Sequence, residues 1–305
     1  MKWEKLGCVF NSDGSKPWMV SHAAVPVALN LGDGRFRIYC STRNEQSCSA
    51  ITFVEIDLED PLKILKVSDE PVLSPGPLGF FDDHGVFAGS IIEHDDRLLM
   101  YYLGWNPGIR QPLFYCSVGL SESTDGGLTF RRLFRAPIID RCEQDPWAVL
   151  LPCIMKEGGL WRMWYGSGIG WEEKDNQLVS YYNIRHAQSS DGLSWDRSGH
   201  VCIGLQPGEF NVAHPFVLRQ GDAYRMWYSF HRGQGYRLGY AESRDGLTWT
   251  RMDDKVGITT SPSGWDSESI SHAHLISFNG ELYMLYNGNG FGRTGFGIAR
   301  LINED

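Results

Sequence analysis

Three aspartates recur at one position of a repeated sequence pattern, and each has a second carboxylate close by. Asp82, Asp145 and Asp266 lie seven residues before the residue that marks the first strand of their repeats. Carboxylates that meet at one site can divide the work of glycosyl transfer, because one donates a proton to the leaving oxygen while another acts as base or nucleophile, and their proximity raises the pKa of one of them. The alternative is that they cap turns or pair with arginine. The candidate catalytic residues are Asp82, Asp83, Glu143, Asp145, Asp266 and Glu268.

Histidines form a second set at related positions. His214 and His272 immediately precede the marker of their repeats, and His274 follows it by one residue. His22 and His84 lie four and five residues before theirs. Such histidines could bind a substrate hydroxyl or phosphate, titrate in catalysis or hold a metal ion. The alternative for any one of them is a hydrogen-bonded core histidine.

Aromatic and hydrogen-bonding residues follow the second strand of each repeat. Tryptophan faces stack on sugar rings, and asparagine and arginine donate to hydroxyls or phosphates. Taken singly, each aromatic residue is more often part of the packing. The candidate substrate-binding residues, histidines included, are His22, Arg43, His84, Trp105, Trp147, Trp171, His214, His231, Arg232, His272 and Asn289.

A repeated aromatic strand signal makes these positions comparable. Arg162-Met163-Trp164-Tyr165 returns as Arg225-Met226-Trp227-Tyr228, with looser copies elsewhere. The last tyrosines of the copies are separated by 63, 63, 63 and 58 residues. A fixed period of this size indicates a repeat architecture. The five tyrosines are Tyr39, Tyr102, Tyr165, Tyr228 and Tyr286.

Turn signals within each repeat predict four strands. Glycine-rich or Asp-Gly turns separate the first strand from the second, as at Gly158-Gly159 and Asn279-Gly280. A Ser-x-Asp-Gly segment after the third strand resembles the Asp-box turn of sialidases, a structural device. The N-terminal segment 2–6 resembles 248–252, a fourth strand. We therefore predict an all-β fold: one domain over residues 1–305, a five-bladed β-propeller of four-stranded antiparallel blades, whose last blade the N-terminal strand completes.

The composition limits the classes of partner. A net charge of −9 and a pI near 5.5 argue against nucleic acid and anionic membranes, which need a basic face. The N-terminus has no secretory h-region, and no apolar run reaches the ~18 residues of a membrane span. The seven cysteines include no CxxC pair. We expect a cytoplasmic protein with reduced thiols and a saccharide, sugar phosphate or sugar nucleotide as partner, its oligomeric state left open.

A five-bladed propeller with such a mouth resembles the furanosidase-type glycosidase superfamily, which includes glycoside hydrolase families 43, 32, 62, 68 and 130. The resemblance implies cleavage or transfer of a glycosidic bond at the mouth. The catalytic motif diverges, because Val25-Pro26 stands where family 43 has Asp-Pro in its first blade. His214-Pro215 has the right spacing in the fourth repeat, and Asp145-Pro146 has the dipeptide six residues too early.

The leading hypothesis is a glycoside hydrolase-like enzyme. One of Glu143 and Asp145 is the acid, one of the remaining four carboxylates is the base or stabiliser, and Arg43, Arg232 and the inner histidines hold hydroxyls or phosphate. A glycosyltransferase or phosphorylase using a nucleotide sugar or phosphate is the alternative within enzymes. A non-catalytic glycan-binding propeller is the alternative outside them, supported by the missing aspartate at Val25. We expect no cofactor, with a metal ion at the propeller axis left open.

Overall fold

The computed structural model describes residues 1–174 and 176–303. Their regular secondary structure is almost entirely β-strand, joined by turns and loops. Consecutive strands pair in groups. The first group is β2 (Ser21–Gly32), β3 (Arg35–Arg43), β4 (Ser49–Asp57) and β5 (Lys66–Val67). The second is β6 (Gly85–His94), β7 (Arg97–Pro107), β8 (Phe114–Ser123) and β9 (Arg131–Arg132). The third is β10 (Val149–Glu157), β11 (Leu160–Lys174), β12 (Gln177–Ser189) and β13 (Val201–Ile203).

The remaining strands continue the series and join the two ends of the chain. The next group is β14 (Asn211–Gln220), β15 (Ala223–His231), β16 (Tyr236–Ser243) and β17 (Thr250–Arg251). The last is β18 (Ser271–Phe278), β19 (Glu281–Asn287), β20 (Phe296–Asn303) and the N-terminal β1 (Lys2–Phe10). A 3-10 turn, η1 (Asp253–Lys255), follows β17, and the short helix α1 (Asn289–Gly292) follows β19. Within the described residues, neither helical segment is long and apolar enough to cross a membrane.

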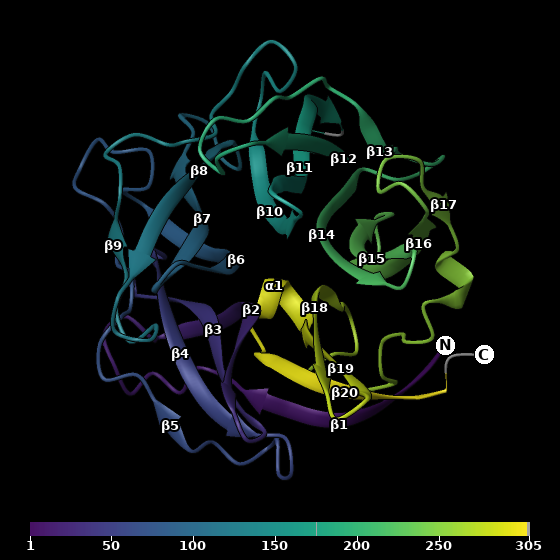
Figure 1. Ribbon diagram of the computed structural model, residues 1–305. Helices are drawn as coiled ribbons and strands as arrows, with labels where there is room; N and C mark the ends of the chain where they lie inside the picture. Colours follow the sequence, from purple (N-terminus) through teal and green to yellow (C-terminus); the bar gives the residue numbers. More distant parts are fainter. Residues whose placement is uncertain (175, 304–305) are drawn as a thin grey trace.

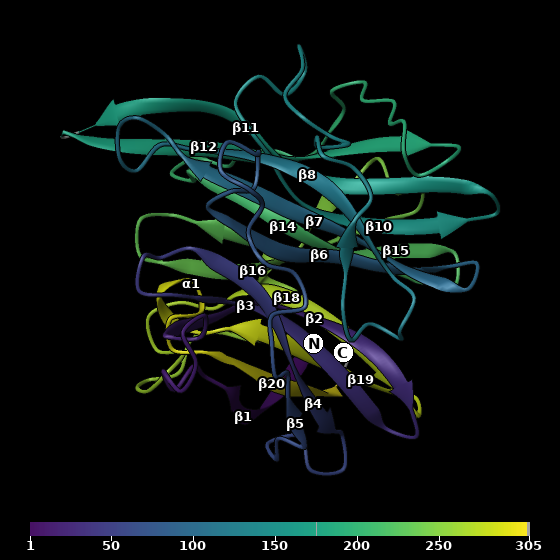
Figure 2. The same cartoon turned by 90° about the vertical axis from the view of Figure 1, so that its left-hand side faces the viewer.

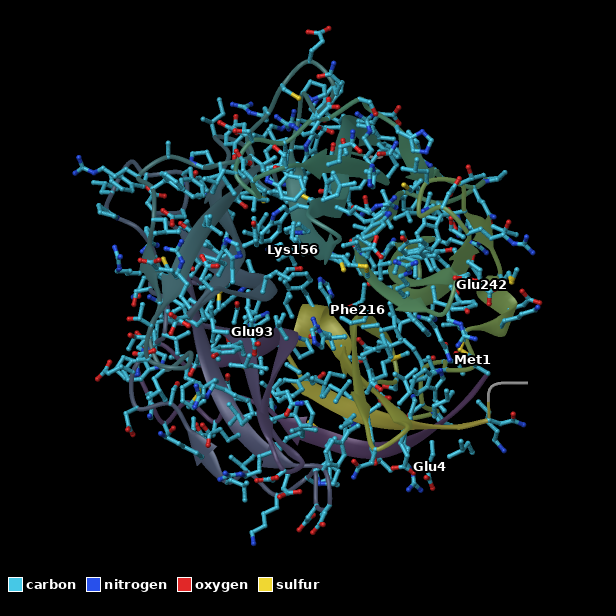
Figure 3. The ribbon with its side chains drawn as sticks, in the orientation of Figure 1. Met1, Glu4, Glu93, Lys156, Phe216 and Glu242 are labelled. Carbon is cyan, nitrogen blue, oxygen red and sulfur yellow. The ribbon has the colours of Figure 1, made fainter. Side chains whose placement is uncertain are left out.

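Pairing within each group is antiparallel, and the groups surround a central axis (Figure 1). Single parallel contacts, Ser49 with Gly85 and Tyr182 with Asn211, link neighbouring groups into two eight-stranded sheets. The third sheet has the order β1-β20-β19-β18. The first strand of each group lies nearest the axis, so that Phe216 of β14 is central whereas Glu4 and Glu242 are peripheral (Figure 3). Seen from the side, the sheets are stacked and strongly twisted (Figure 2). The predicted all-β, propeller-type arrangement is confirmed.

The repeated tyrosines lie on the second strands and are fully buried between neighbouring groups. Trp164 of β11, for example, packs against Tyr224 and Trp249 of the following group, with ring centroids 6.0 and 6.3 Å apart. Burying an apolar side chain of this kind contributes roughly 1.5–3 kcal/mol. The repeated aromatic residues therefore form the hydrophobic core between neighbouring groups.

The three Asp-Gly turns connect the second, third and fourth groups to the group before each of them. In each turn the aspartate accepts backbone N–H groups, and the N–H groups of Ser194 and Leu193 lower the pKa of Asp191 to about 2. The turn carbonyls also accept from aromatic residues of the preceding group: Gly192 from Tyr101 at 2.9 Å, and Gly246 from Trp164 at 2.7 Å. The predicted structural role of these turns is confirmed.

Strand β1 closes the ring of sheets, as the sequence predicts. It pairs with β20 along its length, and the indole nitrogen of Trp3 donates to the carbonyl of Val256 at 2.9 Å. The two ends of the described chain lie close together in both ribbon views (Figures 1 and 2). The N-terminal strand therefore covers the edge that β20 would otherwise expose.

Candidate functional site

The three equivalent aspartates are buried, and each forms an ion pair that joins the loop before the first strand of its group to another segment. Asp82 lies just before β6, where its Oδ2 accepts from Tyr102 of β7 at 3.0 Å and from Nε of Arg132, on β9, at 2.7 Å. Asp266 lies before β18, and its Oδ2 accepts from Tyr286 at 3.1 Å and from Lys5 of β1 at 2.6 Å. We call this arrangement of carboxylate, tyrosine and basic residue the carboxylate clamp.

Asp145 has the most partners of the three. Its Oδ2 accepts from Tyr165 at 2.9 Å and from Arg197 at 3.1 Å. Its Oδ1 accepts from Ser167 at 2.6 Å and from Arg185 at 3.3 Å. A carboxylate with these four donors around it holds the loop before β10 against β11, β12 and the segment that leads into β13. That geometry is structural.

The fourth group contains a variant of the same clamp. Glu209, before β14, accepts from Arg251 of β17 at 2.8 and 2.9 Å, and from Arg232 at 3.0 Å. The repeat alignment therefore identified equivalent positions, and the structure gives them the role that was the alternative, pairing with a basic residue. Among the described residues that line the two central cavities, none is Asp82, Asp145 or Asp266.

The other predicted carboxylates have different surroundings. Glu143 and Glu268 are exposed. Asp83 is half-buried directly before β6, where its Oδ2 accepts from the N–H of Gly79 at 2.8 Å and its Oδ1 accepts from the side chain of Asn106. The residues beside this pair, His84 and Trp105, are in ring contact at 4.4 Å, and Trp105 lines a cavity. Asp83 is thus a carboxylate outside the clamps that precedes, in the sequence, the histidine in contact with the cavity wall.

This cavity, the mouth pocket, lies where the innermost strands begin. It has a volume of about 290 Å³ and an almost entirely aromatic and aliphatic wall. Three of its residues, Arg43, Trp105 and His214, were predicted from the sequence. Its lining residues are Arg43, Phe87, Leu103, Trp105, Phe114, Cys116, Leu150, Ser180, Tyr182, His214, Tyr236 and Phe291.

Arg43 is the cationic side chain of the mouth pocket. It ends β3, and burial lowers the pKa of its guanidinium. Its Nε is buried without a hydrogen-bond partner. A buried donor without a partner costs free energy, so this nitrogen marks a position where a ligand acceptor would be stabilised.

Two further polar atoms of the mouth pocket are buried without partners. They are the hydroxyl of Tyr182 and Nδ1 of His214. Burial raises the pKa of Tyr182 well above its usual value, so the hydroxyl is protonated, and burial lowers the pKa of His214 to about 3, so the ring is neutral. Ser180 opposes the rise in the pKa of Tyr182, although no hydrogen bond of normal geometry joins the two hydroxyls. Orphaned polar atoms that share one cavity indicate a ligand site.

The rings of His214 and His272 are in contact at the centre of the molecule, with centroids 3.7 Å apart and planes tilted by 39°, and the ring of Phe291 lies 4.8 Å from that of His272. Both histidines occupy left-handed backbone conformations at φ 56°, and Val25 does so at φ 58° in the equivalent position. The strand register shifts at each of these three points. Left-handed residues other than glycine are strained and tend to occur where function requires them.

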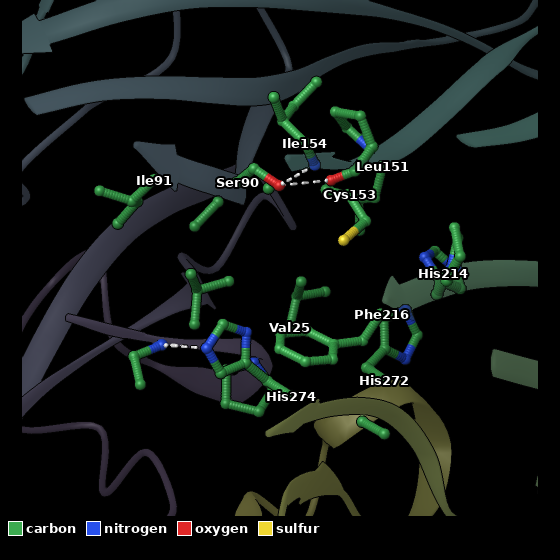
Figure 4. A pocket seen from close by; sticks show the side chains of 18 of the residues that line it. Val25, Ser90, Ile91, Leu151, Cys153, Ile154, His214, Phe216, His272 and His274 are labelled. Atoms are coloured by element: carbon green, nitrogen blue, oxygen red, sulfur yellow. Dashed lines mark hydrogen bonds between the residues drawn. The ribbon is translucent and has the colours of Figure 1, made fainter. Parts of the chain in front are cut away.

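A second cavity lies further along the inner strands (Figure 4). This axial cavity has a volume of about 280 Å³, and His214 lines both cavities. Two of its polar groups are bonded within the protein: Ser90 donates to the carbonyl of Pro152 at 3.0 Å, and Nε2 of His274 accepts from the N–H of Ala28 at 3.1 Å. Nδ1 of His214 and Nε2 of His272 have no partner there, but only the mouth pocket adds a buried guanidinium, that of Arg43. The mouth pocket is therefore the better candidate for ligand binding.

Several predicted binding residues support the wall of the mouth pocket from behind. Trp171 contacts Phe114 at 5.3 Å, and His231 contacts Tyr236 at 5.0 Å. His22 lies near Arg43; burial, then the charges of Arg43 and Arg293, lower its pKa to about 4.

Three predicted binding residues are placed elsewhere by the structure. Arg232 is held by the clamp carboxylate Glu209. Asn289 uses its side-chain oxygen to accept the backbone N–H groups of residues 268 and 269, which fixes a loop. Trp147 is 43% exposed and does not line the mouth pocket. Arg232 and Asn289 are thus engaged by hydrogen bonds within the protein, and Trp147 lies outside the pocket. The repeat alignment shows none of these contacts.

The sequence reasoning missed the residues that the third strands contribute. Tyr182 and Tyr236 each lie three residues before the strand partner of a repeated tyrosine, Arg185 for Tyr165 and Gly239 for Tyr228. This shared position relative to the repeated tyrosine could have identified both residues as equivalent members of the pocket. Phe291 belongs to α1, which interrupts the repeat, so no alignment of repeats identifies it. Among the described residues, no three His, Cys, Asp or Glu side chains are arranged to hold a metal ion.

The sequence comparisons identify close and distant relatives. No family profile matches the chain. It is 41% identical to the "Uncharacterized protein Rv1502" of Mycobacterium tuberculosis (strain ATCC 25618 / H37Rv), over 99% of this chain and 100% of that protein. It is 24% identical to the "1,2-beta-oligomannan phosphorylase" of Thermoanaerobacter sp. (strain X514) over 217 residues, 68% of this chain and 66% of that protein.

Solved structures give the fold. A protein titled "Glycoside hydrolase" matches with a TM-score of 0.75 and 18% identity, over 97% of this chain and 90% of that one. A thermostable family-43 glycoside hydrolase matches with a TM-score of 0.70 and 17% identity, over 95% and 93%. The predicted fold is thereby confirmed. The chain belongs to the family of the Mycobacterium tuberculosis protein Rv1502 and has the propeller fold of the glycoside hydrolases.

Proposed function

We propose that the chain is a carbohydrate-active enzyme, a one-domain five-bladed propeller, that transfers a glycosyl unit from a saccharide to phosphate in the mouth pocket. One observation carries the choice of phosphate. The mouth pocket contains a buried guanidinium with a free donor, Nε of Arg43, and none of the described residues that line it is a carboxylate. Hydrolysis by the usual route requires two carboxylates across the bond. Phosphorolysis requires one acid and a cationic site, because phosphate itself is the nucleophile.

Asp83 is the residue we assign as general acid. A phosphate oxygen forms a bond to the anomeric carbon while the bond from that carbon to the leaving oxygen breaks, and Asp83 gives its proton to the leaving oxygen. The glycosyl phosphate then loses one proton, which restores the acid form of Asp83. Arg43 holds the phosphate through charge-assisted hydrogen bonds. The distant relative named as a phosphorylase supports this proposal.

A second candidate, a non-catalytic glycan-binding propeller, is favoured by the three clamps. The carboxylates that recur in the repeat are committed to tyrosine, arginine and lysine partners. A chain that kept the pocket while its aligned carboxylates serve only the fold would bind sugars without converting them.

The experiment is phosphate release from a panel of glycosyl 1-phosphates in the presence of saccharide acceptors. We expect release that depends on both substrates, with kcat/KM lowered at least ~100-fold in Arg43→Gln because a charge-stabilising donor is lost. Arg35→Gln is the matched control, since Arg35 begins the same strand and is exposed at its far end. Saccharide cleavage at equal rates with and without phosphate would contradict the proposal. Sugar binding without any turnover would favour the glycan-binding alternative.

A further inference from the structure

We infer that the sugar unit held in the mouth pocket is poor in hydroxyls, a deoxy or O-methylated sugar. The inference rests on the proposed function for the location of the glycosyl unit and concerns which unit is selected. It starts from the wall of the pocket. Phe87 and Leu103 of the second group face Leu150 of the third, and Phe291 enters from α1. Apolar side chains therefore come from separate groups around the cavity.

The pocket has several polar residues, but some of their polar groups are already hydrogen-bonded within the protein and are not free to bind a ligand. The indole nitrogen of Trp105 donates to the hydroxyl of Ser49 at 3.0 Å, so Trp105 presents only its ring to a ligand. The hydroxyl of Tyr236 lies 3.2 Å from the side-chain amide of Asn211 and is engaged there. Cys116 is fully buried, and burial raises the pKa of its thiol, which stays neutral and behaves as a small apolar group.

Three buried polar atoms of the pocket have no hydrogen-bond partner: Nε of Arg43, the hydroxyl of Tyr182 and Nδ1 of His214. In the proposed reaction, phosphate occupies the first. The glycosyl unit is then recognised through Tyr182, His214 and the hydroxyl of Ser180, three residues for a ring that in an ordinary hexose carries several hydroxyl groups. Each buried hydroxyl without a partner weakens binding.

Replacing such hydroxyls by hydrogen, methyl or methoxy groups removes this penalty and adds apolar surface to be buried against the wall. The size of the pocket, about 290 Å³, is at the lower end of the range for ligand sites and suits a single sugar unit. The pocket thus combines few hydrogen-bonding residues with a largely apolar wall, and that combination selects a hydroxyl-poor ring.

The test measures binding, so that it does not depend on turnover. The ligands are matched pairs of methyl glycosides that differ by one group: D-galactose against its 6-deoxy form, L-mannose against L-rhamnose, and D-glucose and D-mannose against their O-methyl derivatives. Affinity is measured by calorimetry with inorganic phosphate present. In at least one pair we expect the hydroxyl-poor member to bind ~10-fold or more tightly, the size of effect that one unpaired hydroxyl produces.

Leu103→Asn tests the wall directly, because it adds a polar partner of nearly equal volume. We expect the preference within the pair to fall toward one in this variant, whereas Leu128→Asn, at an exposed leucine of an Asp-Gly turn, leaves it unchanged. Should Leu103→Asn not fold, the ligand pairs on the native protein still decide. Equal or tighter binding of the hydroxyl-rich member in every pair overturns the inference, as does the absence of binding by any member. Neither result bears on phosphate release, so the two proposals fail separately.

Discussion

Asp83 and Asp145 are carboxylates from the same predicted set with opposite surroundings. Asp145 is buried and accepts hydrogen bonds from a tyrosine, a serine and two arginines. Asp83 accepts from one backbone N–H and one asparagine, and it precedes His84, whose ring contacts Trp105 of the pocket wall. Surroundings of the first kind stabilise a fold, and surroundings of the second kind hold the carboxylate with fewer hydrogen bonds and no ion pair.

Asparagine substitutions separate these two roles. Asp145→Asn leaves the two arginines around a neutral side chain, and breaking a buried pair costs about 3–5 kcal/mol. Asp83→Asn keeps one acceptor and costs about 1 kcal/mol of stability, but it lowers turnover ~100-fold or more because the proton donor is lost. Urea unfolding and the phosphate-release assay measure the two effects. Full turnover in Asp83→Asn would remove this residue from the mechanism.

The sequence identified the equivalence of Asp82, Asp145 and Asp266 but not their role. Equivalence is local information, since it follows from the distance to a repeated tyrosine. Role depends on partners, and Asp266 is paired with Lys5, 261 positions away. Arg43 was predicted because it follows a second strand, and Arg232 was predicted on the same ground although Glu209 holds it. Only the fold distinguishes these two arginines.

At the scale of elements, the inner strands carry three neutral histidines, of which His272 is buried and His214 and His274 are half-buried. Desolvation lowers the pKa values of His214 and His274 to about 3, and desolvation together with the nearness of His214 lowers the pKa of His272 well below its usual value. In the unfolded chain these groups titrate near 6.5. Below that pH the unfolded state binds more protons than the folded state. Stability is therefore fully present above pH 6.5 and is lost as the pH falls toward 3.

We expect the free energy of unfolding to fall by about 1 kcal/mol for each of these histidines between pH 7.5 and 5.5. Urea unfolding at both values measures it. His214→Gln should show a smaller pH dependence than the native protein, because one such group is gone. His200→Gln, at an exposed histidine, should show the native dependence. Equal pH dependence in all three proteins would mean that the inner histidines titrate alike in the folded and unfolded states.

The hairpins and Asp-Gly turns were predictable because their signals lie within a few residues of each other. Their second role, accepting hydrogen bonds from the preceding group, was not, since it involves residues such as Tyr101 and Gly192 that are 91 positions apart. The last group ends in β1 in place of such a turn. Trp227, whose counterpart Trp164 donates to Gly246, accordingly has a buried indole nitrogen without a partner.

At the scale of the whole molecule, closure depends on β1. Its residue Lys5 is held by Asp266 at 2.6 Å, and Ile38 and Val54 of the first group form one core cluster with Leu285 and Ile298 of the last. The clamp of the last group is thus made by a residue from the opposite end of the chain.

Lys5→Met removes the basic partner of the buried Asp266. We expect a loss of about 3 kcal/mol in stability, with concentration-dependent association, because a loosened β1 exposes the edge of β20. Thermal unfolding and light scattering at several protein concentrations measure these effects. Lys2→Met, at an exposed position of the same strand, is the control. A monomer of native stability would show that strand pairing alone closes the ring.

The repeat period and the closing strand gave the all-β arrangement from sequence alone. The number of blades and the single domain stay predictions, supported by the grouping of the strands. The mouth pocket was only partly predictable, because its wall combines regular positions such as Tyr182 with Phe291 from a segment outside the repeat. Cavities are formed by what several segments leave unfilled, and no single segment encodes that.

Closure by β1 also affects the order of folding during synthesis. Lys5 is synthesised 261 positions before its partner Asp266, and at ~5–20 residues per second the synthesis of that stretch takes roughly 13–52 s. Over that interval Trp3 lacks the partners that bury it, since its core cluster is formed by Trp227 and later residues. The earlier groups can form in order as they emerge, but the last sheet cannot. The pairing of β1 with β20 therefore takes place only after residues 296–303 have been synthesised, and an obstruction near β1 would delay that step alone.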